Sequence, residues 1–236
     1  MFNGFLLVNK PAGITSHDVV NFIRDRFHMR RVGHGGTLDP LATGLLILML
    51  GRATKLSQNI TGLDKEYLAK MSLGFATATG DLAGEVVDKA EDDSYMNLKE
   101  DQIQKAVDSF IGEIDQVPPM YSAVKFKGKR LYELARRGIE IPREARKVKV
   151  YSMSIEKIEL PEVSLKVNCS RGFYIRQLCI DLGKKLGYPA HLSMMVRTSI
   201  GKFSLIEAKN LDQILNECDS EKNIIPIENV RSLIFK

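Results

Sequence analysis

The stretch His34-Gly35-Gly36-Thr37-Leu38-Asp39-Pro40-Leu41-Ala42-Thr43-Gly44 places one carboxylate, Asp39, in a loop of glycine, threonine and proline. The glycines permit backbone angles that other residues resist, and Pro40 pushes the residue before it toward an extended conformation. An apolar run at 45–50 follows at once and indicates a buried strand. An isolated Asp-Pro pair would indicate only a turn. The whole string predicts a stiff loop that presents Asp39 as a nucleophile or a general base.

The rest of the chain mixes strands and helices without regular βαβ alternation, which predicts an α+β fold. A helix is expected after a cap at Thr15 or Ser16, and another after a capping box formed by Asn97 and Glu100. Strands are predicted at 5–8, 45–50, 66–73, 148–160 and 163–169, and helices at 16–27, 97–111, 130–137, 175–186 and 211–218, before an irregular tail.

Composition narrows the class of protein. The apolar run at 45–50 is far shorter than the roughly 20 residues that span a bilayer, and no basic stretch precedes an apolar one at the start. Cys169, Cys179 and Cys218 are odd in number and lack CxxC spacing, so they indicate free thiols in a reducing compartment. The four histidines are scattered. These features predict a cytoplasmic protein with no membrane contact and no structural or catalytic metal.

Positive charge is concentrated in one segment. The whole chain carries a net charge of +5, whereas residues 125–149 hold ten basic and three acidic residues, so this segment is +7 and the remainder −2. Tyr121, Phe126 and Tyr132 are interleaved with these charges. The pattern suits a nucleic-acid backbone with stacked bases, although an ordinary solvated surface helix would have a similar charge. Residues 120–147 are therefore expected to form a basic, loop-rich insertion around one short helix.

A second motif lies at a predicted junction between a strand and a helix. It reads Cys169-Ser170-Arg171-Gly172-Phe173-Tyr174-Ile175-Arg176-Gln177-Leu178. Arg176 is expected in the first helical turn, where its guanidinium can form a bidentate pair with a carboxylate elsewhere in the fold. In isolation, the same pattern would also fit a surface arginine.

Five sequence blocks in order resemble the TruB family of tRNA pseudouridine-55 synthases. The resemblance extends from about residue 5 to about residue 230, and rests on Val8 to Ser16, His34 to Gly44, Lys65-Glu66-Tyr67, Cys169 to Leu178, and His191-Leu192 to Arg197-Thr198. It implies the pseudouridine synthase fold, with a mixed and mostly antiparallel central sheet flanked by helices and loops. It also implies the isomerisation of one uridine in the T loop of tRNA to pseudouridine, without a cofactor or metal.

The resemblance also implies roles for individual residues. Asp39 matches the catalytic aspartate, acting either as a nucleophile on the sugar or as the base that removes a ribose proton. Arg176 matches the arginine that pairs with that aspartate, and Tyr67 the tyrosine whose ring stacks on the target base. Tyr174 matches a second active-site tyrosine, and Leu192 an apolar wall of the uracil pocket.

The remaining implied roles concern the RNA. His34 matches the histidine that occupies the space left when the base flips out, and Lys10 either contacts RNA or braces the active-site loop. The basic insertion at 120–147 is expected to be mobile and to clamp RNA phosphates, through Arg136, Arg137, Arg143 and Arg146.

The expected organisation is one catalytic domain, 1–236, with the C-terminal PUA domain of many bacterial members absent or truncated. The expected partner is the T stem-loop of tRNA, bound by a monomer that needs no protein partner. Three alternatives stay open at this stage: a guide-RNA-dependent pseudouridine synthase, an RNA-folding chaperone that uses the same surface, and a carboxylate-dependent hydrolase. The hydrolase would need a second acid near Asp39, and neither Asp64 nor Asp81 has a matching context.

Overall fold

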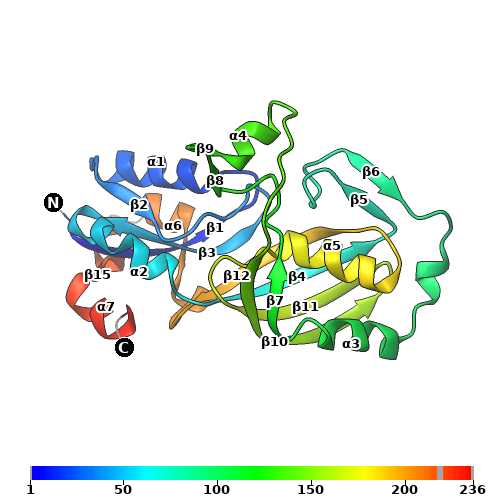
Figure 1. The fold of residues 1–236 in the computed structure, drawn as a ribbon. Coiled ribbons are helices and arrows are strands. Elements are labelled where there is room, and N and C mark those ends of the chain that lie inside the picture. Colours follow the sequence, from blue (N-terminus) through cyan, green and yellow to red (C-terminus); the bar gives the residue numbers. More distant parts are fainter. Residues whose placement is uncertain (1, 217–219, 235–236) are drawn as a thin grey trace. The chain divides into compact units, whose positions relative to one another are not determined.

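The computed structural model describes residues 2–216 and 220–234. The chain divides into two compact units, Met1–Leu68 with Met195–Lys236, and Ala69–Met194. Two strands belong partly to each unit: β4 (Lys65–Leu73) and β12 (Ala190–Ile200) (Figure 1). The expectation of a single catalytic domain stays a prediction.

In the first unit, the sheet is built on two long apolar strands. β1 (Gly4–Lys10) and β3 (Thr43–Leu50) pair antiparallel over their whole length, and β12 pairs with β3 in parallel. Short strands complete the sheet: β2 (Val32–His34) beside β3, β13 (Phe203–Ser204) beside β12, and β14 (Lys209–Asn210) and β15 (Ile225–Pro226) beside β1. The predicted strands at 5–8 and 45–50 are confirmed.

Helices cover both faces of this sheet, which explains why β1 and β3 are apolar at nearly every position. On one face, α1 (Ser16–Arg26) and α6 (Leu211–Asn216) bury Val19, Ile23 and Ile214 against alternate residues of the two strands. On the other face, Ile60 of α2 (Ser57–Thr61) and Val230 of α7 (Ile227–Ile234) pack on the intervening residues. The 3-10 helices η1 (Gly51–Leu56), η3 (Leu205–Glu207) and η4 (Ser220–Asn223) join these elements.

In the second unit, the strand order is β12-β4-β11-β10-β7. β10 (Arg146–Glu159) pairs antiparallel with both β11 (Glu162–Cys169) and β7 (Gly112–Gln116). The strand predicted at 163–169 is confirmed, and its alternate residues Val163, Leu165, Val167 and Cys169 are all buried. α5 (Ile175–Leu186), closed by a left-handed Gly187, packs beside α3 (Glu100–Asp108). A ribbon of β5 (Phe75–Thr77) and β6 (Val86–Lys89) and the 3-10 helix η2 (Ser94–Asn97) complete the unit.

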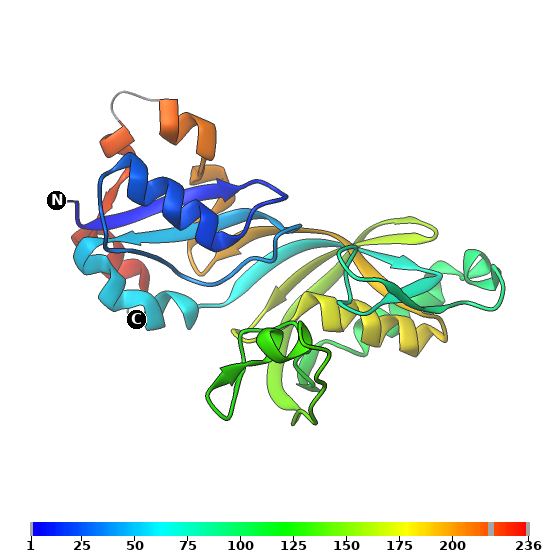
Figure 2. The same cartoon turned by 90° about the horizontal axis from the view of Figure 1, so that it is seen from above.

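The basic insertion leaves the unit at the end of β7 and returns at the start of β10. It contains the hairpin of β8 (Lys125–Phe126) and β9 (Lys129–Arg130), followed by α4 (Leu131–Ala135) (Figure 2). One short helix in a loop-rich segment was predicted here, and this prediction is confirmed with tighter bounds.

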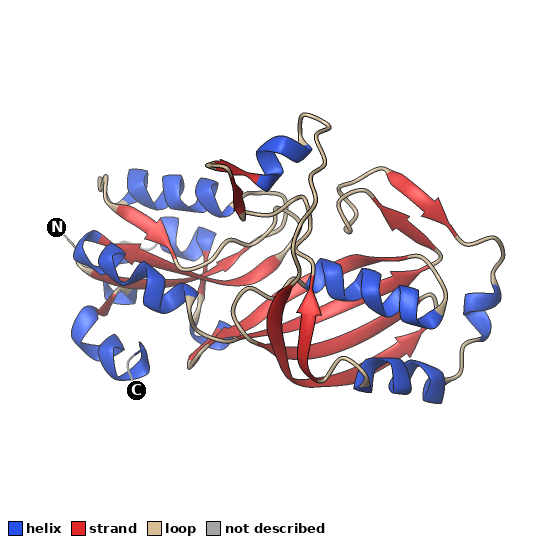
Figure 3. Ribbon diagram, in the orientation of Figure 1, coloured by secondary structure: helices blue, strands red, loops and turns tan. Residues whose placement is uncertain are grey.

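Helices flank a mixed, mostly antiparallel sheet, so the predicted α+β class is confirmed (Figure 3). Thr15 is the cap of α1, in a capping box with Asp18. The capping box predicted at Asn97 is wrong: α3 begins at Glu100 and Lys99 is its cap, because Oε1 of Gln102 accepts the Lys99 N–H.

The predicted irregular tail is also wrong within the described residues. α7 forms there because its apolar residues recur at helical spacing and bury Val230 completely. The predicted end of the 211–218 helix, with Cys218, lies outside the described residues.

Candidate active site

Asp39 lies half-buried in the loop between β2 and β3. The loop is anchored on both sides of the carboxylate. The hydroxyl of Ser16 accepts the Leu38 N–H at 2.8 Å and donates to the Leu38 carbonyl at 3.1 Å. The Pro40 carbonyl accepts the N–H of Gly13 at 2.9 Å. The predicted stiff presentation of Asp39 therefore has a structural basis in bonds to the segment that begins α1.

Lys10, at the end of β1, is fully buried beneath this loop. Its ammonium donates to three carbonyls: Pro11 and Ile14, each at 2.8 Å, and Pro40 at 3.1 Å. Burial lowers the pKa of Lys10 to about 8, while the negative charge of Asp39 acts in the opposite direction. Of the two roles expected for Lys10, these contacts favour bracing the active-site loop over contact with RNA.

A second buried cation, Arg197 on β12, bonds the loop at residues that precede Asp39 in the chain. The side chain is 1% exposed. Its guanidinium donates to the carbonyl of Gly36 at 3.0 Å and, over 3.4 Å, to that of Thr37. Burial lowers the pKa of Arg197, while a side-chain hydrogen bond to Tyr67 and the charge of Asp39 raise it. The first unit therefore brings Lys10, Asp39, Tyr67 and Arg197 together.

The other residues predicted in this unit are consistent with a site around the same loop. Tyr67 is 8% exposed on β4. His34 is the last residue of β2, half-buried and paired with Leu48 of β3. It therefore stands at the entry to the loop that carries Asp39.

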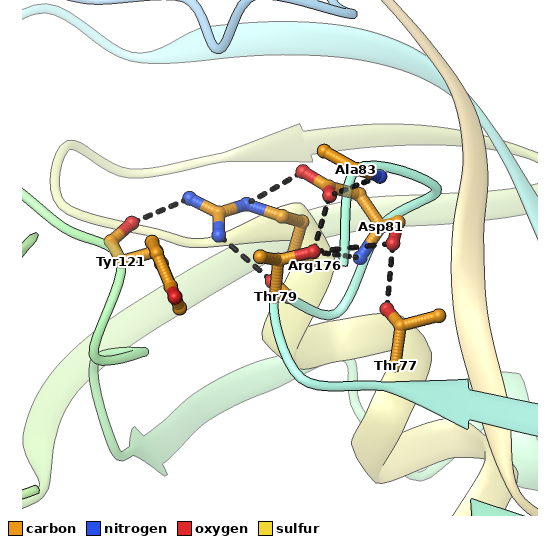
Figure 4. Close-up of polar contacts among 6 residues, drawn as sticks. All are labelled: Thr77, Thr79, Asp81, Ala83, Tyr121 and Arg176. Atoms are coloured by element: carbon orange, nitrogen blue, oxygen red, sulfur yellow. Dashed lines mark hydrogen bonds and ion pairs between the residues drawn. The ribbon is translucent and has the colours of Figure 1, made fainter. Parts of the chain in front are cut away.

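Arg176 lies in the first turn of α5, in the second unit, as predicted (Figure 4). It is 4% exposed, and it donates to the carbonyl oxygens of Thr79 at 2.9 Å and Tyr121 at 2.7 Å. Its Nε lies 3.8 Å from Oδ2 of Asp81. The reading as a surface arginine is therefore wrong. The predicted pair with Asp39, a residue of the other unit, stays a prediction.

Asp81, which sequence analysis set aside, is the acidic partner of Arg176 in this unit. Its carboxylate accepts the Thr79 hydroxyl at 2.5 Å and the Ala83 N–H at 3.0 Å, and its own carbonyl accepts the Thr77 hydroxyl at 2.6 Å. Residues 80–84 form a turn. The signal for Asp81 was present in the sequence, because an aspartate side chain commonly supports a turn by accepting the backbone N–H two residues on, as Asp81 does from Ala83.

The same turn also holds Leu192, which is 5% exposed. The Leu192 N–H donates to the Gly80 carbonyl at 2.9 Å, and Asp81 forms an isolated bridge with Leu192. The structure therefore brings Leu192 and Arg176 together through residues 79–81. Tyr174, the cap residue of α5, is held by Gln116, whose side-chain amide bonds both its N–H, at 2.8 Å, and its carbonyl, at 3.1 Å.

The arginines predicted to bind RNA in the insertion differ in their contacts. Arg136, Arg137 and Arg146 are exposed, and Arg136 lies over the ring of Tyr132 with 5.6 Å to its centroid. The guanidinium of Arg143 instead donates to the Pro118 carbonyl at 3.1 Å and forms an ion pair with Glu140 at 3.0 Å. Arg143 therefore joins the two ends of the insertion.

Within residues 2–216 and 220–234, no cluster of three or more His, Cys, Asp or Glu side chains is placed to hold a metal ion. Cys169 and Cys179 are both buried, and burial raises the pKa of Cys179 to about 12, so it stays an inert thiol. In the described part of the chain, no helix is both long enough and apolar enough to cross a membrane.

Comparisons with known proteins show which family this chain resembles. Residues 24–175 match the family described as "TruB family pseudouridylate synthase (N terminal domain)". A protein of Clostridium tetani named tRNA pseudouridine synthase B is 48% identical over 98% of this chain and 78% of its own length. A protein of the same name from Opitutus terrae is 44% identical over 95% of this chain and 93% of its own length.

Solved structures agree at the level of the fold. A chain from the crystal structure of a Cbf5-Nop10-Gar1 complex has a TM-score of 0.75 and is 32% identical, over 96% of this chain and 60% of that one. The resemblance seen in the sequence is thereby confirmed. The family model covers residues 24–175, and the relatives are similar to this chain over nearly its whole length. This chain therefore belongs to the TruB family of pseudouridylate synthases.

Proposed function

We propose that this chain isomerises uridine 55 in the T loop of tRNA to pseudouridine, with Asp39 as the essential carboxylate. Membership of the family makes the chain an isomerase that forms pseudouridine, and the names of its relatives support tRNA as the RNA. The observation that carries the proposal is the setting of Asp39. It is half-buried on an anchored loop, with Lys10 and Arg197 as its charged neighbours.

The reaction moves uracil on its ribose. The bond between N1 and C1′ breaks, a bond between C5 and C1′ forms, C5 loses a proton and N1 gains one. Atoms and electrons balance without a co-reactant, so one carboxylate and a well-held nucleotide suffice. Asp39 acts either by attacking C1′ or by removing the proton at C2′.

Both roles require an ionised Asp39. The positive charges of Lys10 and Arg197 favour that form, because an opposite charge a few ångströms away stabilises a carboxylate. Arg176 adds a third positive charge in the proposed site and pairs with Asp39, as the family resemblance implies. Its guanidinium is already oriented by the Thr79 and Tyr121 carbonyls.

Two residues are proposed to hold the flipped-out nucleotide, and a third to fill the space that it leaves. A uridine inside a folded loop must be extruded before it can react, at a cost of roughly a few kcal/mol. Stacking on the Tyr67 ring returns on the order of 1–3 kcal/mol per base, and Leu192 supplies an apolar wall. His34 fills the space that the base leaves. The exposed Arg136, Arg137 and Arg146 clamp the phosphates.

The competing functions are less well supported. An RNA-folding chaperone would need the basic surface but not an anchored carboxylate with two buried cations. A guide-RNA-dependent enzyme would need protein partners, and the relatives named tRNA pseudouridine synthase B are more similar to this chain than the Cbf5-Nop10-Gar1 match. We therefore propose a cytoplasmic monomer that acts without a protein partner, which light scattering after gel filtration tests.

The decisive experiment compares Asp39→Asn with the wild type on an unmodified tRNA transcript, with pseudouridine mapped by carbodiimide primer extension. Asp25→Asn is the matched control, because Asp25 is an exposed carboxylate on α1 of the same unit. We expect Asp39→Asn to abolish modification at position 55 while RNA binding stays within about threefold of wild type. Wild-type turnover by Asp39→Asn would remove Asp39 from its proposed role. An unmodified transcript with the wild-type protein would overturn the function itself.

A further inference from the structure

Arg197 forms hydrogen bonds to several positions in and beside the loop that carries Asp39. Its side chain, on β12, is almost completely buried. All three guanidinium nitrogens donate to backbone carbonyls: Nε to Leu45 at 2.8 Å, Nη2 to Gly36 at 3.0 Å and Nη1 to Thr37 at 3.4 Å. These acceptors lie on both sides of Asp39 along the chain. One side chain therefore fixes the start of the loop and the strand that follows it.

The backbone of Arg197 holds the same loop at its far end. In the parallel pairing of β12 with β3, Arg197 is in register with Gly44. Gly44 has a φ of 102°, and a Cβ there would collide with the backbone of Arg197. The loop is therefore closed against this one residue at positions 36, 37 and 44, with Asp39 between them.

A third link runs to Tyr67. The Tyr67 side chain lies close enough to the Arg197 guanidinium to raise its pKa, and the charge of Asp39 acts on Arg197 in the same direction. The carboxylate and the aromatic ring proposed to act on the same nucleotide are therefore tied to one planar group. A lysine ammonium is a single donor atom on a flexible stem, so it cannot reproduce these bonds together.

We propose that Arg197 is a positioning residue for the isomerisation, one that sets the Asp39 carboxylate and the Tyr67 ring in register with each other. This inference rests on the proposed function of Asp39 and Tyr67. It assigns Arg197 no contact with the RNA. Its effect on the reaction is indirect, through the loop at 36–44 and through the Tyr67 hydroxyl.

The first test is single-turnover kinetics of Arg197→Lys, which keeps the charge but loses the planar fork. A misplacement of about 1 Å can cost on the order of 100-fold in rate. We expect a fall of about that size in the rate of pseudouridine formation, with the Kd for tRNA within about threefold of wild type. Arg52→Lys, at an exposed arginine of the same unit, is the matched control and should leave both unchanged. A near-wild-type rate in a folded Arg197→Lys protein would overturn the proposal.

The second test is a double-mutant cycle with Tyr67→Phe, which keeps the ring but removes the hydroxyl that Arg197 contacts. If Arg197 acts partly through Tyr67, the double variant should lose clearly less rate than the product of the two single losses. Fully multiplicative losses would contradict the link.

Two further readouts separate positioning from a merely structural role. In Arg197→Met the positive charge is gone, so the acid limb of the pH–rate profile should move to higher pH as Asp39 becomes harder to ionise. In Arg197→Lys, amide hydrogen exchange of peptides covering 35–44 should accelerate without a matching change in α1. Unchanged exchange in that loop would overturn the proposal. If the wild type leaves tRNA unmodified, the proposed function is refuted. The exchange experiment needs no turnover, so it would still test whether Arg197 holds the loop.

Discussion

Replacing Asp81 with asparagine removes one negative charge while leaving the shape of the side chain almost unchanged. The carboxylate lies 3.8 Å from Nε of Arg176, and the two side chains are 12% and 5% exposed. Two unit charges at that distance attract by about 4 kcal/mol at an effective dielectric constant of roughly 20. The asparagine oxygen can still accept the Ala83 N–H and the Thr79 hydroxyl, and Arg176 keeps its two carbonyl acceptors. Breaking a buried ion pair typically costs about 3–5 kcal/mol, and because these hydrogen bonds remain we expect Asp81→Asn to lower the free energy of unfolding by a smaller amount, about 2 kcal/mol.

The assay is urea unfolding followed by far-ultraviolet circular dichroism, since the chain contains no tryptophan. The matched control is Glu162→Gln, in the same unit. It breaks the ion pair between Lys70 and Glu162, whose atoms are 2.9 Å apart but whose side chains are 30% and 37% exposed. A solvated pair contributes about 0–1 kcal/mol despite its shorter distance, so burial rather than separation decides the order of the two variants.

The consequence for activity follows from the same geometry. Arg176 without its acidic neighbour loses one of the groups that orient it, so we expect the rate of pseudouridine formation to fall by at least about tenfold in Asp81→Asn. A variant as stable as Glu162→Gln and as active as wild type would refute the claim that Asp81 holds Arg176 in place.

Two further predictions concern Lys10 and the insertion. The pKa of Lys10 is lowered from 10.5 to about 8 in the folded protein. Between pH 8 and pH 10.5 the unfolded chain therefore holds a proton on Lys10 that the folded protein has lost. Because unfolding takes up this proton, the free energy of unfolding increases as pH rises. The stability of wild type relative to Lys10→Met should therefore increase by about 3 kcal/mol from pH 8 to 10.5, measured by urea unfolding, and a difference independent of pH would contradict the assignment. Neutralising the exposed Arg136, Arg137 and Arg146 together to glutamine should make the slope of log K for tRNA against log salt shallower by about 2, measured by filter binding. Arg143→Gln should instead destabilise the insertion with little change in that slope, because the Arg143 guanidinium is already bound to the Pro118 carbonyl. An unchanged slope in the triple variant would show that the insertion is not the RNA clamp.

Local patterns in the sequence predicted the long strands β1, β3, β4, β10 and β11, but they missed β12 and several shorter elements, among them β7, α2 and α7. The strands at 45–50 and 163–169 follow from continuous or alternating apolar residues, and the predicted helix 175–186 coincides with α5. β12 interrupts its apolar pattern with His191 and Arg197, both almost completely buried. Their polar atoms are satisfied inside the protein, His191 by the Phe75 carbonyl, so the polarity of the side chain gave no indication of burial.

The candidate site likewise contains residues that the sequence indicated and residues that it did not. Asp39, Tyr67 and Arg176 could be found because a motif surrounds each of them. Arg197 and Asp81 were missed as functional candidates, although Arg197 lies inside a block that carried the resemblance. The atoms that define Arg197's contacts are largely backbone carbonyls, which every residue has and which no pattern of side chains encodes.

Backbone carbonyls are also the acceptors for Lys10 and for two of the Arg176 nitrogens, and this has a consequence for how the enzyme can evolve. A carbonyl survives almost any exchange of its own side chain, so the residues at 37, 45, 79 and 121 are free to drift as far as these bonds are concerned. The three cations have no such freedom. Saturation libraries should therefore recover many functional alleles at an exposed acceptor position such as Thr37 and very few at the donors.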